Sequence, residues 1–106
     1  MVCPFFPQYR PSEAFYQSVT ADIPTLILSG NLDPVTPPSN GDYPAKSLPN
    51  SHHIVVDNAS HTVAMSTCAS NIINEFLTKK TPKQLDESCL KDIPQETFMT
   101  SVNGIQ

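Results

Sequence analysis

Residues 23–38 have the sequence IPTLILSGNLDPVTPP, and this stretch decides the fold class. Residues 23–29 form an aliphatic and β-branched run without alternation, which is typical of a strand buried on both faces of a parallel sheet. The composition of residues 30–34 predicts a turn. Asp33 therefore follows directly after a buried strand, where sites form in open α/β sheets.

Strands and helices continue to alternate after this stretch. We expect a short helix over residues 39–46 and a second strand over residues 52–56. Apolar residues at helical spacing predict a further helix that begins at residue 66 or 67 and ends near residues 79–80. The order strand, helix, strand, helix predicts an α/β fold built from βαβ units with parallel strands.

The predicted sheet is incomplete. Two strands buried on both faces cannot be covered by two helices, and so narrow a parallel sheet leaves open edges. We therefore expect more strands before residue 1. Residues 1–22 are predicted to be an irregular approach segment, residues 23–80 the α/β portion, and residues 81–106 an extended tail.

The composition limits the function classes. The 106 residues carry a net charge of −4, and the longest basic cluster is the pair Lys79-Lys80, so nucleic acid is not expected as a partner. No apolar run approaches the roughly 20 residues that span a bilayer, so no membrane is expected either. The first residues lack the basic segment and long apolar run of a signal peptide.

Asp33 and His61 are the candidate catalytic residues. Both follow predicted strands, so the carboxyl ends of adjacent parallel strands would bring their loops together. A carboxylate that accepts from one ring N–H fixes the imidazole tautomer, and the other nitrogen can take a hydroxyl proton. On spacing alone the alternative stays open that Asp33 only forms a turn and His61 is structural.

Residues 23–38 resemble the acid-loop motif of α/β-hydrolases, especially the C-terminal region of tripeptidyl-aminopeptidase-like (TAP-like) serine peptidases. Residues 48–62 are similar to the second strand and histidine loop of that family, and the resemblance extends over about residues 3–98. It implies the C-terminal βαβα portion of an α/β-hydrolase fold, with Asp33 as triad acid and His61 as general base. Ser60 departs from the Gly that relatives usually have there, which affects the pose of His61.

The resemblance also implies what the parent enzyme is. It would be an extracellular serine exopeptidase that cleaves peptides from a free N-terminus, without cofactor or metal. The partners expected of this chain are therefore the N-terminal part of the hydrolase and, through the complete enzyme, a peptide substrate.

The three cysteines, at positions 3, 68 and 89, are an odd count. The residues alone leave open one pair plus an orphan, or three separate thiols. The family resemblance implies a Cys68–Cys89 disulfide, with a partner for Cys3 earlier in the full enzyme. Closing this loop of about 21 residues would stabilise the fold by roughly 3 kcal/mol.

The nucleophile is absent from this sequence. None of the eleven serines lies in a G-x-S-x-G elbow, so we expect the chain alone to be inactive. The alternative function is a non-catalytic remnant that dimerises or binds a partner through its open sheet edge. The coding sequence upstream of Met1 would separate these two, whereas substrate specificity cannot be predicted from the residues present.

Weaker candidates have ordinary explanations. The three histidines with Asp57 lack the tight spacing of a metal site, and the sequon at residues 58–60 is interpreted as a chance match. Packing of the approach segment, rather than a substrate pocket, is the preferred interpretation of its aromatic residues, Phe5, Phe6, Tyr9, Phe15 and Tyr16.

Overall fold

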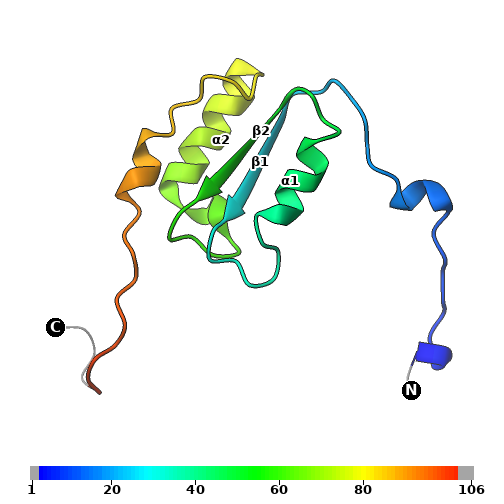
Figure 1. Cartoon of the computed structure of the whole chain (residues 1–106), viewed down its shortest axis with the longest axis horizontal. Helices are drawn as coiled ribbons and strands as arrows, with labels where there is room; N and C mark the ends of the chain where they lie inside the picture. Colours follow the sequence, from blue (N-terminus) through cyan, green and yellow to red (C-terminus); the bar gives the residue numbers. More distant parts are fainter. Residues whose placement is uncertain (1–2, 103–106) are drawn as a thin grey trace.

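Two parallel strands with a helix on each face form the body of the protein (Figure 1). The computed structural model describes residues 3–102. Strand β1 (Thr25–Gly30) pairs with β2 (Ser51–Val56) from Thr25 opposite Ser51 to Gly30 opposite Val56. Helix α1 (Ser39–Ala45) and helix α2 (Thr67–Lys79) lie on opposite sides of the sheet. The predicted order of elements is confirmed.

The core lies between the sheet and α2. It consists of five apolar residues that are less than a tenth exposed: Ile54, Val56, Val63, Ala69 and Ile72. Because side chains alternate along a strand, Ile54 and Val56 face α2 whereas Val55 faces the other way and is 41% exposed. The expectation of burial on both faces is therefore met on the α2 side of β2 and only partly on the other side, where α1 covers His53 but Val55 is exposed.

Helix α2 begins and ends with standard capping interactions. At its start the Ser66 hydroxyl oxygen accepts a hydrogen bond from the Ala69 backbone N–H at 3.1 Å. At its end Lys80 has a left-handed backbone, and its N–H donates to the Phe76 carbonyl at 2.8 Å. These caps explain why the predicted helix bounds agree with the structure to within one residue.

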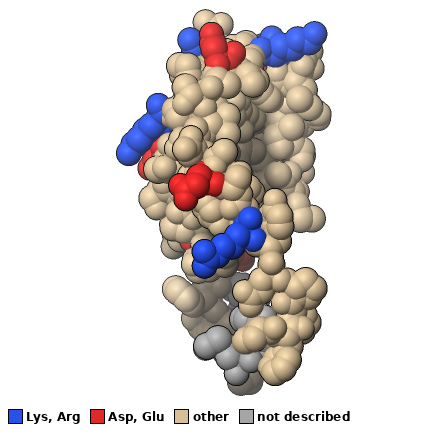
Figure 2. Space-filling model, turned by 90° about the vertical axis from the view of Figure 1, so that its right-hand side faces the viewer, with Lys and Arg blue, Asp and Glu red and all other residues tan. Residues whose placement is uncertain are grey.

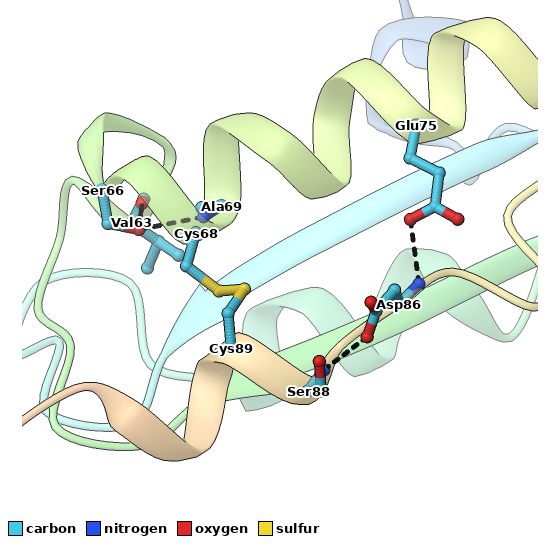
Figure 3. Close-up of a disulfide and its surroundings, with 8 residues drawn as sticks. All are labelled: Val63, Ser66, Cys68, Ala69, Glu75, Asp86, Ser88 and Cys89. Atoms are coloured by element: carbon cyan, nitrogen blue, oxygen red, sulfur yellow. Dashed lines mark hydrogen bonds between the residues drawn. A yellow bond between two sulfur atoms is a disulfide. The ribbon is translucent and has the colours of Figure 1, made fainter.

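The predicted Cys68–Cys89 disulfide is confirmed (Figure 3), with the two Cα atoms 5.8 Å apart. It joins α2 to a 3-10 helix, η4 (Ser88–Asp92), and the Asp86 backbone N–H donates to Glu75 of α2 at 2.9 Å. The first part of the predicted extended tail is thus packed on the body: Pro82 is buried, and Leu85, Leu90 and Ile93 contact the core. The Cys3 side chain is outside the described part of the structure, so its expected pairing with a cysteine earlier in the full enzyme stays a prediction.

Most of the approach segment lies away from the body (Figure 1), but near its end the Ser18 hydroxyl donates to the Tyr43 hydroxyl of α1 at 3.1 Å. The segment contains two 3-10 helices, η1 (Cys3–Phe5) and η2 (Glu13–Tyr16), and extends away from the sheet, as does the end of the tail (Figure 1). The radius of gyration is 18.4 Å, against roughly 13 Å for a compact domain of this length. The aromatic residues of the approach segment are 64–87% exposed, and Phe15 and Tyr16 contact each other edge to face with ring centroids 5.3 Å apart. The expected packing of the segment is therefore met only in part. Within residues 3–102, no helix has the length and apolar character needed to cross a bilayer.

Candidate active site

The two strands deliver Asp33 and His61 to the same end of the sheet. Asp33 lies in the loop over residues 31–38, the acid loop, and His61 in the loop over residues 57–62, the histidine loop. Both loops leave carboxyl ends of adjacent parallel strands (Figure 1). Nδ1 of His61 lies 2.9 Å from Oδ2 of Asp33, which confirms the predicted hydrogen bond.

Close backbone contact between the loops sets this geometry. The Leu32 N–H donates to the Ala59 carbonyl at 3.0 Å, so the acid loop is bonded directly to the histidine loop. A Cβ atom on Gly30 would lie 2.2 Å from the Ser60 carbonyl oxygen and 2.5 Å from that of Ala59. Only glycine fits at position 30 because both obstacles are backbone atoms.

Ser60 does not strain the histidine loop. Its φ is not positive, and the left-handed residue of this loop is Asn58, at φ 58°. Asparagine tolerates that conformation better than most residues do. The Ser60 departure from the family pattern therefore leaves His61 in hydrogen-bond contact with Asp33.

The acid loop wraps the Asp33 carboxylate, whose side chain is only 4% exposed. The backbone N–H groups of Val35 and Thr36 donate to Oδ1 at 2.8 and 3.0 Å, and the Thr36 hydroxyl donates to Oδ2 at 2.7 Å. Hydrogen bonds to the charged form, the Thr36 hydroxyl first among them, hold the pKa of Asp33 far below its usual range. Asp33 is therefore a carboxylate at every pH at which a histidine is neutral.

This ionisation state fixes the tautomer of His61. A carboxylate only accepts hydrogen bonds, so Nδ1 of His61 carries the proton and Nε2 of the neutral ring has a free lone pair. The His61 side chain is 56% exposed, so its ring is accessible to another molecule. Chemically, the pair can accept a proton at Nε2 while Asp33 stabilises the resulting imidazolium.

The family model described as TAP-like protein matches residues 1–89. This chain belongs to the TAP-like family. Its described residues have the fold of the C-terminal portion of an α/β-hydrolase. No curated protein and no solved structure matches the chain.

The TAP-like chain holds its other two histidines away from the Asp33–His61 pair. Nε2 of His52 lies 2.5 Å from Oε1 of Glu87, a contact that ties β2 to the packed part of the tail. His53 lies on the α1 side of the sheet, with Nδ1 2.9 Å from Oδ1 of Asp42 and Nε2 2.8 Å from the Ser29 hydroxyl. None of these contacts was predicted, because no motif or strand-end position in the sequence marks these side chains as partners.

Ser29, His53 and Asp42 are connected in the same order as a Ser-His-Asp triad, but the His53 side chain is mostly buried. The His53 side chain is 9% exposed. Helix α1 lies directly over it, since a Cβ atom on Gly41 would be 2.5 Å from its Nε2. Because α1 covers His53, we interpret the cluster as an attachment of α1 to the sheet.

We expect His53→Ala to destabilise the TAP-like chain by about 1–3 kcal/mol. The change leaves a cavity under α1 and deprives the partly buried Ser29 hydroxyl of its partner. His52→Ala is the matched control, since the His52 side chain is 40% exposed and its loss should cost less than about 1 kcal/mol. Urea denaturation of the three proteins measures the difference, and equal midpoints for the two variants would contradict the assignment.

Other features of the TAP-like chain do not contribute to this site. No group of three or more metal-ligating side chains occurs among residues 3–102. A pocket of about 380 Å³ lies at the amino end of β1, the opposite end of the sheet from Asp33, and its mostly apolar lining includes Val19, Ile23 and Leu48. On the face shown in Figure 2 the charged side chains are scattered over a mostly uncharged surface.

Proposed function

We propose that this chain supplies the acid and the general base of a serine peptidase that cleaves peptides from a free N-terminus. The observation that carries the proposal is the hydrogen bond between Asp33 and His61, 2.9 Å long, at the carboxyl ends of adjacent strands. In this assignment Nε2 of His61 takes the proton of a serine hydroxyl and later returns it to the leaving amine, while Asp33 orients and stabilises the ring.

The serine and the oxyanion hole would come from a hydrolase segment outside this sequence. The sequence has no G-x-S-x-G elbow, and triads on this fold follow the order Ser, Asp, His along the chain. The sheet supports this requirement, because each of its two strands has one neighbour among the described residues. Strands of the partner segment would pair with an open edge, and the exposed aromatic residues of the approach segment offer further contact area.

A second candidate function is a non-catalytic binding module, as predicted above. The same open edges and exposed aromatic residues favour it, since an unpaired strand can bind an extended segment of another protein. The two candidates differ in the role of His61. In the first, His61 acts in catalysis once the hydrolase segment is bound, and in the second the complex is inactive.

A complementation assay tests the proposal. A TAP-like peptidase lacking its own segment equivalent to residues 1–89 is co-expressed with this chain, and hydrolysis of a tripeptidyl fluorogenic amide is measured. We expect this chain alone to give no turnover and the pair to be active. The His61→Ala chain should restore no activity, whereas the His52→Ala control should restore it.

Two other outcomes of the assay would contradict the proposal. A stable complex that remains inactive would favour the binding module. Turnover by the isolated chain that His61→Ala abolishes would instead overturn the need for a partner, because the nucleophile would then lie within this chain.

A further inference from the structure

The Thr36 hydroxyl lies between the two members of the Asp33–His61 pair. Its oxygen is 2.7 Å from Oδ2 of Asp33 and 3.1 Å from Nδ1 of His61. Those two atoms are themselves 2.9 Å apart, so the three form a closed triangle. We infer that Thr36 is a positioning residue that fixes the orientation of the His61 ring relative to the Asp33 carboxylate. The inference rests on the proposed function only for its effect on catalysis.

The hydrogens in this triangle have one consistent arrangement. The Asp33 carboxylate donates nothing, so the single proton of the Thr36 hydroxyl goes to Oδ2. A lone pair of the hydroxyl oxygen then faces the Nδ1–H of His61, which already points at Oδ2. Nδ1–H therefore has two acceptors, and rotation of the ring away from Asp33 would weaken both hydrogen bonds.

Thr36 contacts both oxygens of the carboxylate. Its backbone N–H donates to Oδ1 and its hydroxyl to Oδ2, so one residue fixes the carboxylate plane that His61 meets. The β-branched side chain of threonine restricts χ1, which limits the positions the hydroxyl can take. The lowered pKa of Asp33, to which this hydroxyl contributes most, agrees with the arrangement.

The alternative is that the hydroxyl only stabilises the turn of the acid loop. In that case replacing it would change the free energy of unfolding but not the environment of His61. Thr36→Val separates these roles, because it keeps the branched shape and the backbone N–H while removing the hydroxyl. Val35→Ala is the matched control, since Val35 is 69% exposed and its hydrogen bond to Asp33 comes from its backbone N–H.

The test uses NMR of the full 106-residue chain. The measurements are the Asp33 pKa from its carboxyl ¹³C shift, and the His61 tautomer and Nδ1–H exchange from ¹⁵N spectra. Thr36→Val should raise the Asp33 pKa by at least about one unit and speed the exchange of Nδ1–H at least tenfold. Thr36→Ser and Val35→Ala should leave the pKa within about half a unit of the wild-type value.

A folded Thr36→Val protein with an unchanged Asp33 pKa and unchanged Nδ1–H exchange would overturn the inference. If Thr36→Val does not fold, Thr36→Ala and Thr36→Ser replace it, and equal His61 spectra in these two would have the same meaning. In the complementation assay Thr36→Val should lower kcat roughly tenfold with KM unchanged, and Thr36→Ser should retain most activity. Expected NMR results together with an inactive wild-type pair would refute the proposed function but not the role of Thr36.

Discussion

We expect Asp33→Asn to lower kcat in the complementation assay by about 10⁴-fold and to cost far more activity than stability. The size of the effect is that of removing the orienting carboxylate from a Ser-His-Asp triad. An asparagine side chain can present N–H instead of oxygen to Nδ1 of His61, and the ring then takes the tautomer whose Nε2 cannot accept a proton. Some stability is lost as well, because the lowered pKa of Asp33 shows that the folded state favours the charged carboxylate. The Asn oxygen can still accept from the backbone N–H groups of Val35 and Thr36, which limits this loss.

Asp42→Asn is the matched control for this prediction. Asp42 also lies 2.9 Å from a histidine Nδ1, that of His53, but it is part of helix α1 rather than of a loop at the carboxyl end of the sheet. It should leave kcat within a factor of about three, since it touches no reacting group. His61→Ala should be as severe as Asp33→Asn. Two results would contradict the triad assignment. One is an Asp33→Asn enzyme that keeps a tenth or more of the wild-type kcat. The other is an Asp42→Asn enzyme whose kcat falls as far as that of Asp33→Asn.

We expect Gly30→Ala to destabilise the chain by at least about 3 kcal/mol and to separate the two loops of the site. The new Cβ atom would clash with the carbonyl oxygens of Ala59 and Ser60. These are backbone atoms, so the clash cannot be relieved by a change of side-chain rotamer. Because His61 directly follows Ser60, the displacement would move the imidazole away from Asp33. Urea denaturation and the His61 Nδ1–H signal in NMR spectra measure the two effects.

Gly41→Ala is the comparison for this second prediction. Its Cβ atom would also lie close to other atoms, but these belong to the side chains of His53 and Ser29, which can shift. Alanine also favours a helix by up to about 1 kcal/mol over glycine, so the loss of stability should be smaller than for Gly30→Ala. The Asp33–His61 hydrogen bond should survive in Gly41→Ala. A Gly30→Ala protein as stable as the wild type would show that the loops are not in close contact.

The amino-acid sequence by itself determined the order of the elements, because strand and helix formation depend on local patterns. The continuous apolar run over residues 23–29 and the helical spacing before Lys79 predicted β1 and α2 to within two residues. Asp33 and His61 could be paired because parallel strands place their following loops at the same end of the sheet. The Cys68–Cys89 pair followed from family resemblance rather than from spacing.

Only the tertiary structure decided which side chains complete and support the site. Thr36 belongs to the quoted motif, but its contact with His61 spans 25 positions and depends on how the two loops close. The same applies to Gly30, where a distant backbone excludes a Cβ atom, and to His53, which α1 covers. Local patterns carry no information about such contacts, because the folding of the intervening chain brings these residues together.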